Sequence, residues 1–228
     1  MNGKLINKTI DSIVAIITVV CGMLTSLGVS FFSVLIFSGF FLNFPNELRI
    51  SNKHILVDYY SLLEYLCSYS PGHLHFRFLS MSRTASEHFA EVRVFVHYGM
   101  VITIIALGLF LFLFRAKKKR NQLWELIPLY QELMLMLIVF TSLIAISFQD
   151  SFLWFHYHVF NDNYWIFNPK TDPIILVLND NFFLKYFICW TITMLLIFWG
   201  INVYTKHLIK LFIRTGKFRF NSTCNSWN

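Results

Sequence analysis

Four long apolar runs divide the chain, and they constrain its fold more than any other feature. They cover residues of about 13–37, 94–114, 126–148 and 184–204. Each is long enough to cross a hydrocarbon core of roughly 30 Å as a helix. Because a backbone inside a bilayer must satisfy its own hydrogen bonds, we predict an all-α integral membrane protein whose four transmembrane helices form one domain over residues 1–228.

The composition agrees with this class of protein. Hydrophobic residues make up 56% of the chain and charged residues only 14%, which is far more apolar than an average soluble domain. The first run follows charged residues, as the apolar part of a signal peptide would, but it exceeds the ~7–15 residues of such a segment. We therefore expect it to remain as a membrane anchor.

Basic residues predict the orientation, because lysine and arginine near the ends of spans favour the cytoplasmic side. Lys4 and Lys8 precede the first run, the segment RAKKKR (115–120) follows the second, and five basic residues between 206 and 219 follow the fourth. We therefore expect both termini inside and the loops 43–93 and 149–183 outside, packed on the outer face of the bundle. The net charge of +7 is explained by this arrangement, so we do not expect nucleic acid as a partner.

The two outer loops differ in pattern. Residues 54–67 repeat apolar side chains at helical spacing, and a second helix is expected to start near Ser82, Thr84 or Ser86 and to run into the second span. In the other loop, Pro169, Pro173 and several asparagines disfavour a continuous helix.

Two histidines stand at the outer membrane boundary, where His88 enters the second span and His156 follows the third. Two imidazoles that face one cleft can divide the roles of general base and general acid. Glu91 lies one helical turn from His88 and faces the same side. As an alternative, His97 and Glu132 inside the spans could line a polar path in a non-catalytic transporter component or sensor.

Other chemistries have weaker support in the sequence. A haem needs histidines at matching depth, but only His97 is clearly within a span. HYH (156–158) could contribute to a zinc site, yet two histidines in a loop lack fixed geometry. The serine elbow GxSxG is absent, and the four cysteines are scattered without a CxxC motif. We expect no metal site and no cofactor.

Two stretches together resemble the lipoprotein intramolecular transacylase (Lit) family. They are SMSRTASEHFAEVRVFV (80–96) and FHYHVFNDNYWIFNPKTDPIILVLNDNFF (155–183). The resemblance implies an enzyme of the Gram-positive plasma membrane that needs no cofactor. Its implied partners are diacylglyceryl-modified lipoproteins, which are its substrates, and the surrounding membrane lipids. The implied reaction is transfer of the sn-2 acyl chain to the α-amino group of the N-terminal cysteine, which yields a lyso-form lipoprotein.

The resemblance also implies roles for individual residues. The histidines of the family pattern match His88 and His156, which are then the catalytic pair, and its Trp and Asp match Trp165 and Asp172. We expect a wider set of residues to bind the substrate or orient the histidines: Glu91, Asn161, Asp162, Asn163, Trp165 and Asp172. The chain departs from the family pattern by reading Asp162-Asn163 in place of Asn-Asp and by carrying Asn168 before the first proline of the loop, where Asp is usual.

Overall fold

The computed structural model describes residues 2–70, 72–160 and 162–215, and these residues form helices joined by loops. Seven α-helices and four short 3₁₀ helices occur in this part of the chain. In order they are α1 (Asn2–Phe37), η1 (Ser38–Phe41), η2 (Asn46–Leu48), α2 (Asn52–Cys67), α3 (Arg83–Lys119), η3 (Leu123–Glu125), α4 (Leu126–Ile146), α5 (Phe148–Val159), η4 (Asn163–Trp165), α6 (Ile174–Val177) and α7 (Asp180–Arg214).

Four helices are long and apolar enough to cross a membrane, namely α1, α3, α4 and α7. This confirms the predicted all-α membrane fold. α3 and α7 each extend well beyond the apolar runs at both ends, so they carry polar residues out of the expected span. The run at 126–148 is interrupted, because α4 ends at Ile146 and a new helix begins at Phe148.

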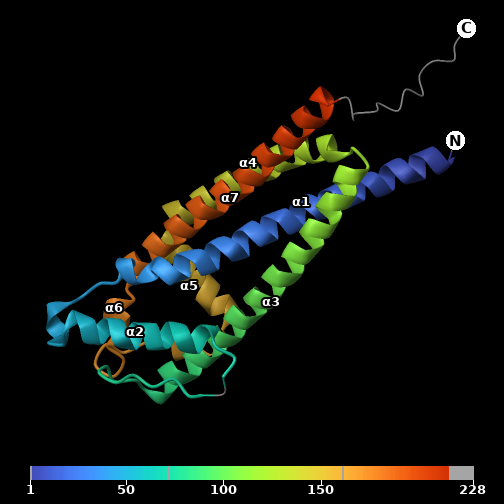
Figure 1. Ribbon diagram of the computed structural model, residues 1–228. Helices are drawn as coiled ribbons and strands as arrows, with labels where there is room; N and C mark the ends of the chain where they lie inside the picture. Colours follow the sequence, from blue (N-terminus) through green and yellow to red (C-terminus); the bar gives the residue numbers. More distant parts are fainter. Residues whose placement is uncertain (1, 71, 161, 216–228) are drawn as a thin grey trace, which may run out of the picture.

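The bundle has two distinct ends (Figure 1). The first turns of α1, the last turns of α7 and the connection between α3 and α4 lie together at one end, which we call the terminal end. α2 and α6 lie at the opposite end, beside the first turns of α3, and we call this the loop end. The arrangement places the two long connections of the chain on the same side of the bundle.

The terminal end is held by a buried polar cluster around Lys117, whose side chain is only 2% exposed. Its ammonium group donates hydrogen bonds to the backbone oxygen of Asp11, at 2.8 Å, and to the carboxylate of Glu125, at 2.6 Å. Gln122 donates to the carboxylate of Asp11 at 2.8 Å. One lysine of the RAKKKR segment therefore joins α1, α3 and η3, a role that its charge pattern alone does not indicate.

The loop end has its own apolar core, to which α2 contributes Ile55, Tyr59 and Leu62. The carboxylate of Asp58, on the same face of α2, accepts backbone hydrogen bonds from Arg77, Phe78 and Leu79 at 2.8, 3.0 and 2.8 Å. These bonds fix the segment that leads into α3. The prediction that the loop 43–93 packs on the end of the bundle is thus confirmed for its described residues, with helix 54–67 observed as α2.

Loop 149–183 contains more helix than the sequence suggested. Residues 148–159 form α5, so HYH (156–158) is helical and its assignment to a loop was wrong. The expected break occurs later, between Phe160 and Pro173, where η4 is the one short helix in the described residues. Because the prolines and all five asparagines of this loop lie after residue 160, their effect does not reach back to the histidines.

Candidate active site

His88 lies in the second turn of α3, where the start of the helix is firmly anchored. The hydroxyl of Ser82 caps the helix by accepting a hydrogen bond from the backbone N–H of Ala85 at 3.1 Å. The backbone N–H of Ser82 in turn donates to the carboxylate of Asp172 at 2.6 Å. Loop 149–183 therefore holds the helix end that carries His88. Of the three predicted caps, Ser82 is the one observed.

His156 lies in the last turn of α5, and one hydrogen bond fixes its protonation pattern. Its Nδ1 is 2.7 Å from the backbone oxygen of Phe152. A carbonyl oxygen only accepts, so Nδ1 carries the hydrogen and the neutral ring presents Nε2 as an acceptor. His156 is therefore prepared to take a proton at Nε2.

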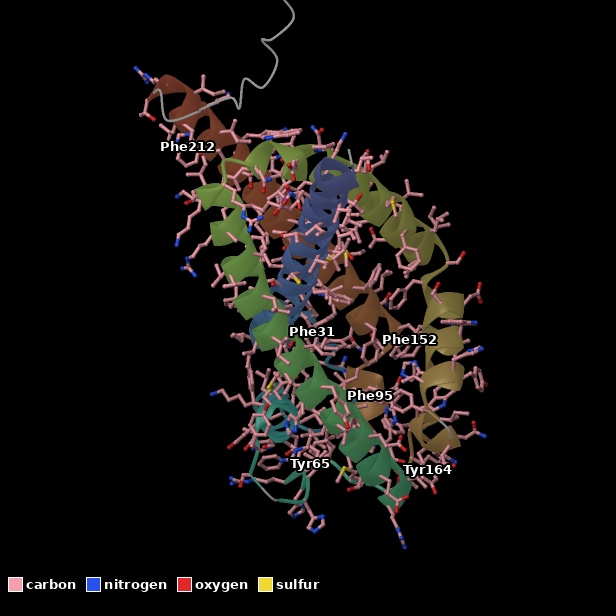
Figure 2. The ribbon with its side chains drawn as sticks, turned by 90° about the vertical axis from the view of Figure 1, so that its right-hand side faces the viewer. Phe31, Tyr65, Phe95, Phe152, Tyr164 and Phe212 are labelled. Atoms are coloured by element: carbon pink, nitrogen blue, oxygen red, sulfur yellow. The ribbon has the colours of Figure 1, made fainter. Side chains whose placement is uncertain are left out.

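The structure brings the two predicted histidines together. Their ring centroids lie 6.2 Å apart, and the ring of Phe160 contacts both, at 4.6 Å from His88 and 5.4 Å from His156. His88 is buried at 7% exposure, and His156 is half-buried. In Figure 2 the side chains of Phe95 and Phe152, from α3 and α5, lie in the lower half of the molecule, toward which these two helices converge.

The apolar surroundings favour the neutral form of His156. Burial lowers the pKa of its imidazole below the usual value of 6.5, while the hydrogen bond to Phe152 acts weakly in the opposite direction. A neutral imidazole is the form that acts as a general base. His156 therefore keeps this capacity at neutral pH.

Three buried polar atoms around the pair have no hydrogen-bond partner within the described residues. They are Nδ1 of His88, Oε2 of Glu91 and Nε1 of Trp165. Glu91 Oε2 is 4.0 Å from His88 Nδ1, which is too long for a hydrogen bond but confirms that the two face each other. Buried polar groups are normally paired, so these atoms are free to bind polar groups of a substrate.

Trp165 belongs to this site through η4. Its ring lies 5.1 Å from that of His156 and packs edge-on against Tyr157 at 4.9 Å. The indole nitrogen can only donate a hydrogen bond. Because it is buried and unpaired, it offers a free donor beside the base.

The other predicted site residues are placed differently. Asp172 is buried and bonded to Ser82 and to the hydroxyl of Thr171, at 2.6 and 2.7 Å, so it positions α3. Asp162 and Asn163 are exposed in the segment after α5. Asn161 lies outside the described residues. Asn168 accepts a hydrogen bond from the backbone of Lys170 at 3.0 Å and thereby stabilises the turn.

His158 faces away from this pair, although only one residue separates it from His156. It bonds to the backbone oxygen of Trp154 at 2.8 Å and stacks on the ring of that residue. Side chains at positions i and i+2 of a helix point to roughly opposite faces. HYH therefore does not place two ligands around one point. Within the ranges described, no three His, Cys, Asp or Glu side chains gather as a metal ion would require.

The residues of the alternative polar path lie in separate environments. His97 stacks on Tyr69 at 4.5 Å, near the loop end, while Glu132 is exposed on α4. Their positions give no support to the transporter or sensor interpretation.

Sequence reasoning missed the aromatic side chains that enclose the histidines. Phe152 is four residues before His156 and Phe160 four residues after it, and both rings pack against its imidazole. The ring of Phe167 lies 5.6 Å from that of His88, centroid to centroid. The spacing of four along Phe152, His156 and Phe160 was available in the sequence. It would have been informative only if α5 had been recognised as a helix.

Comparison with known proteins identifies a family. The model of the family described as "Lipoprotein intramolecular transacylase Lit" matches residues 10–183. That range includes His88, His156 and Trp165. No curated protein sequence matches the chain significantly.

Three solved structures are similar to this chain, and all three are of the membrane integral lipoprotein intramolecular transacylase Lit from Bacillus cereus. One has a TM-score of 0.76 and 23% identity, and the match covers 92% of this chain and 99% of that one. Two variants of that enzyme, with a histidine replaced by arginine or by alanine, each give a TM-score of 0.77 and 22% identity. The matches to the arginine and alanine variants cover 95% and 94% of this chain and 97% and 99% of theirs. At this identity the likeness establishes a shared fold.

Proposed function

The chain belongs to the lipoprotein intramolecular transacylase family and is a membrane acyltransferase, and we propose that it moves the sn-2 acyl chain of a diacylglyceryl-modified lipoprotein to the α-amino group of that protein's N-terminal cysteine. The product is a lyso-form lipoprotein. The observation that carries the proposal is the pair His88 and His156, which face each other among unpaired buried polar atoms.

The first step needs a base. An α-amino group has a pKa of roughly 8, so much of it is protonated and unreactive at neutral pH. Nε2 of His156 is the acceptor that its hydrogen bond to Phe152 leaves free. In the proposed reaction it takes a proton from the amine as the nitrogen attacks the ester carbonyl carbon.

The second step needs a donor for the negative oxygen that this attack creates. The N–H of Trp165 is buried, unpaired and next to His156. A donor already in place when charge develops is an effective source of rate enhancement. We assign Trp165 to this oxygen.

The third step expels the glyceryl oxygen. Burial and the neighbouring His156 lower the pKa of His88 to about 4, so its ring is neutral at neutral pH. His88 therefore receives from His156 the proton taken from the amine and passes it to the glyceryl oxygen as the carbon–oxygen bond breaks, which leaves both rings neutral again. Glu91 faces Nδ1 of His88 and stabilises its protonated form. Hydrogen bonds in catalytic sites often shorten only when substrate binds, which is consistent with the 4.0 Å separation.

The ester and the amine are carried by the same cysteine, so the reaction is intramolecular. Holding two such groups in contact can supply much of the rate, and no acyl-enzyme is required. Asp162 and Asn163, exposed beside the site, are proposed to contact the polar part of the lipidated peptide.

We further propose that the protein lies in a bacterial plasma membrane as one domain, with the loop end outside and both termini in the cytoplasm. The RAKKKR segment lies at the terminal end, which supports this orientation through the positive-inside rule. Outer-leaflet lipids then surround the site, and lipoproteins reach it from the membrane.

The proposal can be tested in a bacterium whose lipoproteins remain in the diacyl form. Expression of this chain should convert them to the lyso form, which mass spectrometry of N-terminal lipopeptides would detect. Unchanged diacyl lipopeptides, with the protein shown to be present in the membrane, would refute it.

A further inference from the structure

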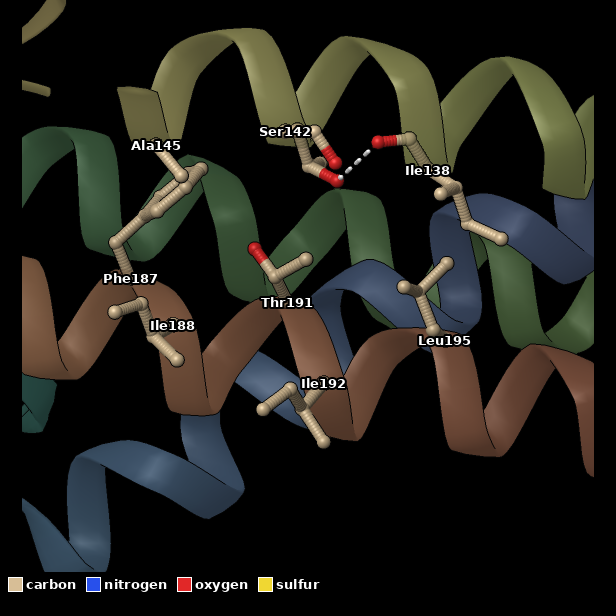
Figure 3. A pocket seen from close by; sticks show the side chains of 9 residues that line it. Ile138, Ser142, Ala145, Phe187, Ile188, Thr191, Ile192 and Leu195 are labelled. Carbon is tan, nitrogen blue, oxygen red and sulfur yellow. Dashed lines mark hydrogen bonds between the residues drawn. The ribbon is translucent and has the colours of Figure 1, made fainter. Parts of the chain in front are cut away.

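A small apolar cavity, open on one side, lies between α4 and α7 (Figure 3). No histidine is among the described residues that line it. Its volume is about 170 Å³. Six of its nine lining residues are apolar: Ile138 and Ala145 of α4 and Phe187, Ile188, Ile192 and Leu195 of α7. Of the polar residues, Thr141 bonds to the backbone oxygen of Leu137 at 2.7 Å. The cavity is therefore suited to hydrocarbon.

Aromatic side chains connect this cavity with the active site. The ring centroid of Phe187, in the cavity wall, lies 5.7 Å from that of Phe148. The ring of Phe152 is the next in the row, with its centroid 6.0 Å from that of Phe148 and 4.0 Å from that of His156. Phe148, Phe152 and His156 follow one another at intervals of four and so share one face of α5. Phe183 of α7 packs against Phe152 at 5.0 Å. A continuous apolar surface thus runs from the base to the cavity.

The length of this surface matches an acyl chain. Eight residues of helix separate Phe148 from His156, or roughly 12 Å along the axis. One leaflet of hydrocarbon is about 15 Å deep, half of a core of roughly 30 Å. A chain whose ester carbonyl lies at His156 would reach the cavity with its last carbons.

The size of the cavity limits how much of the chain it accepts. An apolar cavity of about 150 Å³ holds one benzene molecule. By the same measure, the space between α4 and α7 accepts a segment of about six carbons, which is the terminal part of a long acyl chain.

We propose that the cavity between α4 and α7 binds the methyl end of the migrating acyl chain and thereby selects long chains over short ones. This inference rests on the proposed transacylase function. It adds a binding site for the part of the substrate farthest from the reacting ester.

Filling the cavity provides the test. Ala145→Phe places a ring in the wall, whereas Leu143→Phe adds a ring at a position on α4 that is 61% exposed, outside the cavity. Each purified protein would be assayed with synthetic S-diacylglyceryl lipopeptides that carry palmitoyl or octanoyl chains. We expect Ala145→Phe to lower kcat/KM for the palmitoyl substrate by about tenfold or more relative to the octanoyl substrate, while Leu143→Phe keeps the wild-type ratio.

Retained octanoyl activity shows that Ala145→Phe is folded, so an unchanged ratio in that variant would overturn the inference. A second measurement does not depend on turnover. The wild-type protein would be irradiated with a palmitoyl lipopeptide that carries a diazirine at the chain end. Labels on residues 138–145 or 187–195 support the cavity, and labels elsewhere overturn it. Failure of the wild type to convert any lipopeptide would instead refute the proposed function, and the labelling result would still decide the cavity.

Discussion

The imidazole rings of His88 and His156 lie 6.2 Å apart, centroid to centroid, although one belongs to the start of α3 and the other to the end of α5. The ring of Phe160 contacts both. Asp172 fixes the first of these helices by accepting the backbone N–H of Ser82. Loops 43–93 and 149–183 therefore assemble one site between them.

The pH dependence should reflect the burial of His156. Burial lowers its pKa below 6.5, so the ring stays neutral until the pH falls below that value. We expect the acid limb of kcat/KM to have its midpoint below pH 6.5, with activity lost as pH decreases further. Phe160→Ala, which admits water, should move the midpoint upward. A wild-type midpoint at or above 6.5 would contradict this account of His156.

Trp165→Phe should reduce turnover more than binding. The change keeps an aromatic ring beside His156 but removes the N–H assigned to the developing oxyanion. Loss of one such donor typically costs about 10²–10³ in kcat, and we expect a drop of this size with little change in KM. Trp154→Phe, at an exposed position of α5, is the matched control and should retain activity. Near wild-type kcat in Trp165→Phe would exclude the assigned role.

Asp58→Asn should weaken the loop end. The carboxylate accepts three backbone hydrogen bonds, and an amide presents a donor where one of its oxygens accepts. We expect a loss of about 2 kcal/mol, because buried donors are left without partners. The midpoint of thermal unfolding in detergent would show it. Glu64→Gln, exposed on the same helix, should leave the midpoint unchanged, and equal midpoints for both variants would disprove the role of Asp58.

Gly28 should be intolerant of a side chain. A Cβ added there would collide with the side chain of Thr103, since α1 and α3 approach closely at this point. Gly28→Ala is expected to destabilise by about 1–3 kcal/mol through overpacking. A Cβ at Gly108 of α3 meets no atom within 4 Å, so Gly108→Ala should be neutral or stabilising by up to about 1 kcal/mol. Detergent unfolding midpoints compare the two variants, and stabilisation by Gly28→Ala would contradict the close packing.

Much of the fold could be predicted because hydrophobicity dominates in a membrane protein. The four apolar runs indicated α1, α3, α4 and α7, and the spacing of residues 54–67 indicated α2. The sequence did not indicate α5. The prolines and asparagines that follow residue 160 suggested a non-helical segment for the whole of loop 149–183. The buried role of Lys117 was also missed, because a lysine in a basic segment normally stays in water.

The candidate site could be predicted only in outline. His88 and His156 lie next to the ends of apolar runs in the sequence, which suggested that they meet, and their rings do lie 6.2 Å apart. The tautomer of His156 depends on its hydrogen bond to Phe152, and the part played by Asp172 depends on a contact with Ser82. These contacts join segments far apart in the chain or require the local helix, so no motif records them.

The most direct test of the site compares three histidine variants in a quantitative assay of purified protein with one diacylglyceryl lipopeptide, read by mass spectrometry. His88→Ala and His156→Ala should each lower the rate of lyso-product formation by about 10²–10⁴, the usual contribution of general acid–base catalysis. His158→Ala, on the same helix but turned away from the pair, should keep the wild-type rate. Wild-type activity in either of the first two variants, with the protein folded, would contradict the account.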